Sequence, residues 1–440
     1  MQFNSNSDLP SLPASDPLEF PTVDPYPCAR ITTRIYHPSR DTITMVPNVL
    51  VRTMMPKRAK VAPDDSSISS FLSSSSSDGS DMEAEDNVGA ESPDTQDENV
   101  RAYWMQRTIR EAIYGRVLCG IVLKKKRVRE AEWVVTTEQC AIKEMAWQHI
   151  RKERDRLAED PIKEVGSMQY LMRWHESITG DSTSTDSFSA MASLNIMMPM
   201  DLLSDDRHLY SVMPYCDGGE LFDRLDMEEK FSEAEARYWM YQILNGIENL
   251  QRAGICHRDL SLENLLVHKS GCLIIDMGMC LRIKLGNNDM SMSFQTLNLG
   301  SNNESGEANA YLRDGRNSPR HWITPQGTCG KWIYMSPEVY NNQVDFDGFA
   351  VDMWAVGVIL FLMLTGFPPW ERACVTDDRF KFMTTGYLVQ MLTEWKIGIS
   401  ADGMDLLQRM LFLDPSDRLC LDQVRAHPWM QGPLTPPLPY

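Results

Sequence analysis

The chain has 440 residues, 42% of them hydrophobic, and a formal net charge of -18. This length accommodates one large domain or two, with a substantial core. Residues 61–100 hold eleven Asp or Glu and no Lys or Arg, so most of the acidic excess is local. That distribution argues against a basic nucleic-acid-binding surface, and no apolar run is long enough to span a membrane. We therefore expect neither nucleic acid nor membrane as a partner.

The ten cysteines are scattered and include no C-x-x-C pair, which argues against a zinc module or a disulfide framework. The first residues lack the basic and then apolar pattern of a signal peptide. These features predict a cytoplasmic protein. Basic clusters at 56–61 and 124–127 are weak signals for nuclear import, and solvated charge is the favoured interpretation of each, the second lying in a loop between strands.

Residues 1–107 are rich in Ser, Pro, Asp and Asn, with five consecutive serines at 73–77. Such a composition buries too little apolar surface to offset chain entropy, so we predict that residues 1–107 are disordered. The folded domain is expected over residues 108–430. A Pro-rich tail follows at 431–440 and is interpreted as a plain terminus rather than a peptide ligand.

The most informative stretch runs from Ile255 to Gly278. Apolar runs at 265–267 and 273–275 flank a polar turn, which predicts a hairpin that brings Asn264 close to Asp276. An amide oxygen beside a carboxylate is a hard, oxygen-rich site suited to Mg²⁺. Asp259 would lie beside this site, where its carboxylate can accept a proton from an incoming hydroxyl.

This stretch resembles the catalytic loop and the D-F-G element of eukaryotic protein kinases, and Ser336-Pro337-Glu338 takes the place of A-P-E. The resemblance implies a two-lobed α+β fold with a small β-rich N-lobe and a larger helical C-lobe. It also implies phosphoryl transfer from ATP, with Mg²⁺, to protein Ser or Thr hydroxyls. The catalytic loop is a variant, H-R-D-L-S-L-E-N, and Thr365-Gly366-Phe367-Pro368-Pro369-Trp370 resembles the calcium/calmodulin-dependent group. By this resemblance Asp259 is catalytic, and Asn264 and Asp276 bind the metal.

The resemblance also assigns the nucleotide site. Two strands and a phosphate-covering turn are expected around Gly115 and Gly120, with Val117 in place of the middle glycine of the Gly-rich loop. Lys143 would meet the ATP phosphates and pair with Glu164 from a helix over 162–174, Glu159 being the fallback. The full set of predicted nucleotide-binding residues is Gly115, Gly120, Val122, Ala141, Lys143, Glu164, Met213, Pro214, Cys216, Glu220, Leu266 and Asp276.

Further elements follow in chain order. An exposed insertion is expected at 177–193, a hinge at 209–221, and a helix capped by Ser232. A long activation loop would span 276–338, with a mobile insert at 285–320. The apolar run 352–364 predicts a buried core helix on which Asp352 holds the catalytic loop, and Glu338 is expected to pair with Arg418.

Two departures from the family pattern face each other. Serine/threonine kinases carry Lys where this chain has Ser261, and Lys331 stands where the family has a Thr near the catalytic Asp. We predict that Lys331 supplies the missing cation and is therefore catalytic. Val117 and Ser261 also keep open the alternative of a pseudokinase that binds nucleotide or acts as a scaffold.

Substrate choice and switching complete the expectations. Glu220 and Glu263 match positions that recognise basic residues, so protein substrates with Arg upstream of the acceptor are predicted. Arg258 often pairs with a phosphothreonine in the family, and the corresponding place is Gly327 here. Candidate sites for an upstream activating kinase are therefore the neighbouring Thr324 and Thr328.

Overall fold

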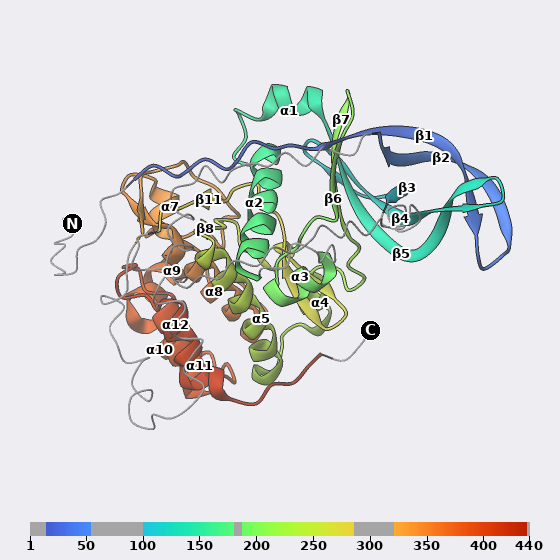
Figure 1. The fold of residues 1–440 in the computed structure, drawn as a ribbon. Helices are drawn as coiled ribbons and strands as arrows, with labels where there is room; N and C mark the ends of the chain where they lie inside the picture. The colour runs from blue at the N-terminus through green and yellow to red at the C-terminus, as the bar shows by residue number, and fades with distance from the viewer. Residues whose placement is uncertain (1–14, 54–99, 180–186, 286–320, 438–440) are drawn as a thin grey trace, which may run out of the picture. The chain divides into compact units, whose positions relative to one another are not determined.

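The computed structural model describes residues 15–53, 100–179, 187–285 and 321–437, and the chain divides into two compact units (Figure 1). We call them the barrel unit and the helical unit and describe each by itself. The barrel unit comprises Asp24–Glu144 and Leu202–Val212, and the helical unit comprises Met1–Val23, Met145–Asp201 and Met213–Tyr440.

The barrel unit is a closed sheet of seven strands in the order β1-β2-β3-β4-β5-β7-β6. Consecutive antiparallel hairpins form most of it, and the parallel pairing of Tyr26 with Leu203 closes it between β1 and β6. Apolar side chains such as Ile35, Val49 and Trp133 pack together in its core. The strands are β1 (Tyr26–His37), β2 (Thr42–Arg52), β3 (Arg101–Ala112), β4 (Gly115–Val128), β5 (Ala131–Ala146), β6 (Asp201–Ser204) and β7 (His208–Pro214).

The prediction that residues 1–107 are disordered is wrong for β1 and β2, and the domain starts before residue 108 because β3 begins at Arg101. β-Branched residues make up four of the twelve residues of β1 and six of the eleven of β2, and Ile35, Val49 and Leu50 are fully buried. The apolar residues within these two strands are enough for strand formation, although the average composition of residues 1–107 is polar. The serine run and the basic cluster at 56–61 lie outside the described residues, whereas the cluster at 124–127 lies within β4 rather than in a loop.

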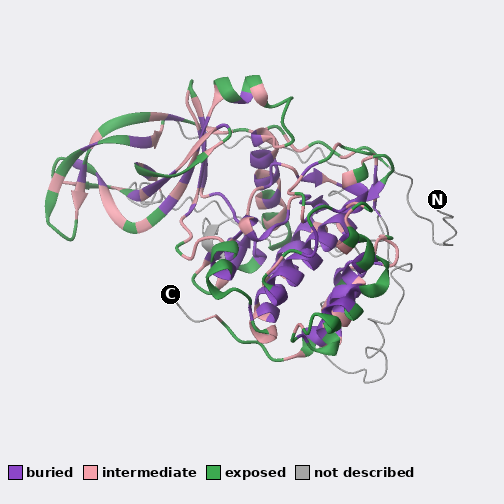
Figure 2. Cartoon of the chain, turned by 180° about the vertical axis from the view of Figure 1, so that it is seen from behind, coloured by how far each residue is buried: buried purple, intermediate pink, exposed green. Residues whose placement is uncertain are grey.

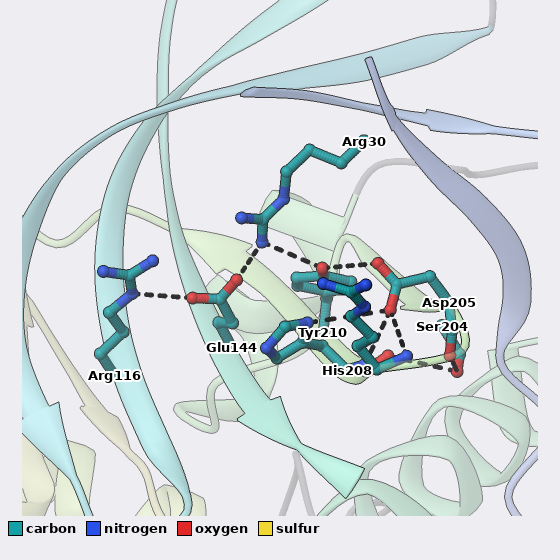
Figure 3. Close-up of polar contacts among 8 residues, drawn as sticks. Arg30, Arg116, Glu144, Ser204, Asp205, His208 and Tyr210 are labelled. Carbon is teal, nitrogen blue, oxygen red and sulfur yellow. Dashed lines mark hydrogen bonds and ion pairs between the residues drawn. The ribbon is translucent and has the colours of Figure 1, made fainter. Parts of the chain in front are cut away.

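A polar network fastens β1 to the rest of the barrel unit (Figure 3). Arg30 forms an ion pair with the buried carboxylate of Glu144 and donates to the Tyr210 hydroxyl at 3.0 Å. Arg116 donates to the other carboxylate oxygen of Glu144 at 2.7 Å, and Tyr210 donates to Asp205 at 2.8 Å. Burial raises the pKa of Glu144, but the hydrogen bonds from the two arginines outweigh burial and hold this pKa below its usual value.

The helical unit is built from helices and short two-stranded sheets. A π-helical turn at Met383–Tyr387 joins α9 to α10. The strands are β8 (Ile255–Cys256), β9 (Leu265–His268), β10 (Gly271–Ile274), β11 (Leu281–Arg282), β12 (Trp322–Ile323) and β13 (Phe346–Asp347). The helices are α1 (Trp147–Glu153), α2 (Pro161–Thr179), α3 (Ser187–Leu194), α4 (Leu221–Glu228), α5 (Glu233–Arg252), α7 (Pro337–Asn341), α8 (Gly348–Thr365), α9 (Asp378–Phe382), α10 (Leu388–Glu394), α11 (Ala401–Met410) and α12 (Leu421–Ala426).

The predicted helices α2, α5 and α8 are confirmed. The Ser232 side chain accepts from the Glu235 N–H and caps α5. Helix α8 is long and apolar enough to span a membrane by length and composition, but 94% of it is buried inside the protein, as expected of a core helix (Figure 2). Residues 177–179 of the expected exposed insertion are exposed but belong to α2, and residues 180–186 lie outside the described residues. The expected exposure is wrong for α3, which buries Met191.

Candidate active site

The hairpin β9–β10 is confirmed, with Leu265 opposite Ile274 and His268 opposite Gly271. The residue before β9 is Asn264, whose carbonyl accepts from the Ile275 N–H at 3.0 Å. This bond extends the ladder by one step. The hairpin therefore fixes Asn264 next to the strand end that leads to Asp276, as the sequence predicted.

Asp259 and Asn264 are joined directly. The Asn264 amide nitrogen donates to the Asp259 carbonyl at 2.7 Å and to its carboxylate at 2.9 Å. Burial raises the pKa of Asp259 to about 6, while the charge of Lys331 opposes this rise. The carboxylate is thus oriented, half-buried, and a stronger base than an ordinary aspartate.

Asp352 on α8 holds the loop that carries Asp259. Its carboxylate oxygens accept from the backbone N–H groups of His257 and Arg258 at 2.7 and 2.8 Å. These bonds satisfy a buried carboxylate and fix Arg258 in a left-handed conformation, with φ of 67°. The predicted role of Asp352 is confirmed.

Asp276 has a φ of 66°, a conformation that non-glycine residues adopt infrequently. Ligand atoms of Glu159, Glu164 and Asp276 lie within 4.8 Å of one another. The Asn264 amide nitrogen is used on Asp259, so its oxygen is the atom left for a metal. Carboxylate and amide oxygens are the ligands that Mg²⁺ prefers, and these residues fit that ion.

Lys331 lies against the catalytic loop. Its ammonium donates to the Ser261 hydroxyl at 2.7 Å, as the predicted exchange of Ser261 and Lys331 requires. The preceding Gly330 has a φ of +89°, and a Cβ there would lie 3.0 Å from the Arg258 carbonyl and 3.3 Å from an Asp259 carboxylate oxygen. Glycine thus allows the close approach of the two loops.

The side chain of Arg258 reaches the place predicted for a phosphothreonine. It donates to the Gly327 carbonyl at 2.9 Å. Of the neighbours, Thr328 is exposed, whereas the Thr324 hydroxyl donates to Asp16 at 2.7 Å. The insert at 286–320 lies outside the described residues.

The predicted hinge contacts β9. The Gly218 N–H donates to the Val267 carbonyl at 3.1 Å, and a Cβ on Gly218 would lie 2.8 Å from that oxygen. Glu220 forms a bridge with Leu266, which brings these two predicted residues together. Met213 and Cys216 are half-buried, and Pro214 is buried. Burial raises the pKa of Cys216 to about 12.

The turn predicted between Gly115 and Gly120 is wrong. Both glycines lie within β4, and the hairpin turn is at 113–114, where Ala112 pairs with Gly115. Gly120 and Val122 are buried in the interior of β4, away from that turn, and their contact with nucleotide stays a prediction. Aligned on the actual turn, Gly115 is the third glycine of G-x-G-x-x-G-x-V, and Val117 is its valine. In this alignment Arg110 and Ala112 replace the first two glycines. The stretch Tyr114-Gly115-x-Val117 was the sequence signal from which this alignment could have been found.

Lys143 and Ala141 lie on β5 of the barrel unit, whereas Glu164 lies on α2 of the helical unit. Their ion pair therefore stays a prediction. Glu164 is buried, and both it and the fallback Glu159 belong to the carboxylate group around Asp276.

The Glu338–Arg418 pair is confirmed and completely enclosed. Arg418 donates to both carboxylate oxygens at 2.7 and 3.3 Å and to the Ala350 carbonyl at 2.9 Å. Its guanidinium also stacks over the Trp354 ring at 4.8 Å. The pair ties the end of the activation loop to the core helix.

Residues 126–430 match the family model described as the protein kinase domain. The match begins within β4 and leaves β1, β2 and β3 outside it.

Curated relatives agree with this match. Serine/threonine-protein kinase SRK2H of Arabidopsis thaliana is 29% identical over 271 residues, covering 61% of this chain and 65% of the relative. Serine/threonine-protein kinase SAPK6 of Oryza sativa subsp. japonica is 30% identical over 277 residues, covering 62% and 65%. CBL-interacting protein kinase 1 of the same rice is 29% identical over 248 residues, covering 56% and 45%. The chain spans less than two thirds of the length of these relatives.

Proposed function

Because this chain belongs to the protein kinase family, we propose that it is an ATP-dependent serine/threonine kinase that phosphorylates proteins. The observation that carries the proposal is the hydrogen bond from Asn264 to Asp259, beside the β9–β10 hairpin whose second strand leads to Asp276. Each of these residues has the side-chain type that protein kinases use for phosphoryl transfer. The alternative, a pseudokinase, would have no need for an oriented carboxylate beside oxygen ligands.

Asp259 accepts or orients the proton of the substrate hydroxyl. Its carboxylate is held by Asn264, and its pKa of about 6 leaves it ionised near neutral pH yet more basic than an ordinary aspartate. The backbone bonds to Asp352 keep the loop fixed during the transfer. This fixed orientation contributes through positioning.

Asn264 and Asp276 would hold Mg²⁺, which supplies positive charge to the phosphates of ATP. Lys143 is the residue proposed to anchor those phosphates, with Glu164 as its partner. Ala141, Leu266 and the hinge residues Met213, Pro214 and Cys216 would receive the adenine.

Lys331 supplies the cation that the catalytic loop lacks at Ser261. Its ammonium lies at 2.7 Å from the Ser261 hydroxyl, and its charge acts on Asp259. A short serine leaves room for the lysine stem from the opposite loop. Lys331 thus neutralises charge on the transferring phosphoryl group.

An upstream activating kinase would act at Thr328 rather than at Thr324. Thr328 is exposed and adjoins the Gly327 carbonyl that binds Arg258, whereas a phosphate on Thr324 would face the Asp16 carboxylate and would not activate. A phosphate on Thr328 would offer Arg258 a stronger acceptor than that carbonyl.

The proposed location is cytoplasmic, with nuclear import through residues 124–127 as the alternative.

Transfer of radiolabelled γ-phosphate from ATP to a protein substrate tests the proposal. The wild-type chain should label serine or threonine, and Asp259→Asn should reduce the rate by at least about a hundredfold, because proton transfer contributes about 10² to 10⁴. Equal labelling by the variant would show a contaminating kinase. Nucleotide binding without transfer would establish the pseudokinase.

A further inference from the structure

The N-terminal segment Ser15–Val23 is the part of the helical unit that the family pattern does not account for. It crosses the helical unit in extended form, and Figure 1 shows this blue segment passing α2 towards β11 and α7. Pro17 and Pro21 restrict its backbone, which lowers the entropy lost when it docks. We call these nine residues the strap.

The strap pairs with the strand at the start of the activation loop. The Leu18 N–H donates to the Arg282 carbonyl at 2.8 Å, and the two residues form an antiparallel bridge. Arg282 lies on β11, which pairs on its other side with Ile255 of β8, just before the catalytic loop. The strap therefore adds an isolated bridge to a two-stranded sheet that would be marginal alone.

It also pairs with the strand at the end of the activation loop. The Ser15 N–H donates to the Trp322 carbonyl at 3.2 Å, and the Ser15 carbonyl accepts from Thr324 at 3.3 Å. β12 pairs in turn with β13, next to the start of α8. One short segment thus contacts residues near both ends of the predicted activation loop.

A third contact joins the strap to α2, the helix that carries Glu164. The Phe20 ring meets Tyr170 edge to face at 6.0 Å, and the Arg282 guanidinium lies 4.4 Å from the centre of the Tyr170 ring. A Cβ on Gly166 would lie 3.3 Å from the Cβ of Phe20, so glycine permits this packing. The strap, β11 and α2 therefore interlock.

One side-chain contact makes this docking sensitive to charge. The Thr324 hydroxyl donates to the Asp16 carboxylate at 2.7 Å. A phosphate on Thr324 would remove the donor and place about -1.5 to -2 charges against that carboxylate. Thr324 also precedes Pro325, which suits a proline-directed kinase.

From these contacts we propose that the strap is an intramolecular ligand that keeps the activation loop and α2 in the active arrangement, and that phosphorylation of Thr324 releases it. In that step an upstream kinase transfers the γ-phosphoryl group of ATP to the Thr324 oxygen, the hydroxyl proton leaves to that kinase's base, and ADP is the second product. The effect on rate rests on the proposed kinase activity, whereas the docking itself does not.

Hydrogen exchange by mass spectrometry on the full chain measures docking without reference to activity. Leu18→Pro removes the N–H that bonds Arg282, and the side chain is 39% exposed, so little packing is lost. Exchange at the Thr324 amide should rise about tenfold or more as docking weakens. Glu19→Ala is the matched control, because Glu19 contributes only its backbone carbonyl to Arg282. Unchanged exchange in Leu18→Pro would overturn the proposal.

Substitutions that change charge test whether Thr324 is the release site. Thr324→Asp should raise exchange at the amides of residues 18 and 324, which bond Arg282 and Ser15, and lower phosphoryl transfer about tenfold. Thr328→Asp should leave these two amides protected. Adding Asp16→Lys to Thr324→Asp restores attraction and should restore protection and rate. Protection that is insensitive to charge at position 324 would overturn the release step. Faster phosphoryl transfer upon release would make the strap inhibitory and overturn its activating role. If hydrogen exchange changes as expected in a chain that never transfers phosphate, only the proposed kinase activity is refuted.

Discussion

The ammonium of Lys331 donates a 2.7 Å hydrogen bond to the hydroxyl of Ser261, two residues after Asp259, the proposed catalytic residue. The lysine expected in the catalytic loop and the threonine expected in the facing loop are thus replaced as a pair. Such a compensated exchange preserves a cation at the site, although the cation comes from the other side.

The first prediction concerns this pair. Lys331→Ala should lower kcat about thirtyfold or more with little change in the KM for ATP, since a transition-state contact is worth about 2 to 4 kcal/mol. Steady-state kinetics on a protein substrate measures both constants. The double variant Ser261→Lys, Lys331→Thr restores the family arrangement and should recover activity to within about threefold of wild type.

Lys381→Ala provides the control for that experiment, because Lys381 is an exposed lysine of the helical unit. It should leave kcat unchanged. A loss below about threefold in Lys331→Ala would assign Lys331 to the surface and favour the pseudokinase.

The second prediction concerns substrate choice. Glu263 accepts from the Tyr334 hydroxyl at 3.2 Å, which holds its carboxylate in place for a basic residue of the substrate. In a peptide library the wild type should prefer Arg upstream of the acceptor, and Glu263→Gln should reduce that preference about tenfold. Glu220→Gln tests the second position in the same way. Indifference to upstream Arg, or a preference for acids, would contradict the assignment.

The third prediction concerns the buried pair of Glu338 and Arg418. Arg418→Ala leaves an enclosed carboxylate without its partner and should lower the free energy of unfolding by about 3 to 5 kcal/mol, measured in urea. Replacing both residues by Leu should cost less than the single change. Arg425→Ala is the control, because its ion pair with Glu248 is partly exposed and should contribute within about 1 kcal/mol.

The fourth prediction concerns the pH dependence of stability. The pKa of Glu144 is held below its usual 4.5, so the unfolded chain binds more protons than the folded chain between these two values. Stability of the barrel unit should therefore be fully present above about pH 4.5 and fall as the pH falls through the folded pKa. Glu144→Gln should be less stable at neutral pH and show a shallower decline.

Thermal unfolding from about pH 7 to about pH 3 measures that slope. Glu130→Gln is the matched control because Glu130 is an exposed carboxylate of the same unit, with a side chain 76% exposed. It should follow the wild-type curve, and an identical curve for Glu144→Gln would show that the arginine network contributes nothing.

Much of the helical unit was predictable from the sequence because its motifs are local. The spacing of Asn264 and Asp276 encodes a hairpin, and the ungapped distance from Glu338 back to Lys331 places that lysine opposite Ser261. Both inferences depend on short chain segments whose geometry is restricted by hydrogen bonding. The core helix α8 was equally clear from its continuous apolar run.

The misses have a different physical cause. The strands β1 and β2 are stabilised by pairing with residues far along the chain, such as Tyr26 with Leu203, and average composition does not reveal such contacts. The Gly-rich loop was misplaced because two glycines, Gly115 and Gly120, were taken to flank a turn. Gly120 instead lies inside β4, where a Cβ would be 3.2 Å from the Trp104 carbonyl oxygen. The docking of Ser15 beside Ile323 likewise has no local signature.

Closure of the barrel has a consequence for solubility. A sheet whose first and last strands are joined has no free edge, and free edges are templates on which other chains add strands. A chain shortened to the matched residues 126–430 would lose β1, β2, β3 and most of β4. The remaining strands β5, β7 and β6 would then expose unpaired N–H and C=O groups along two edges. Such a fragment is expected to form aggregates, although it retains Lys143, Asp259, Asn264 and Asp276.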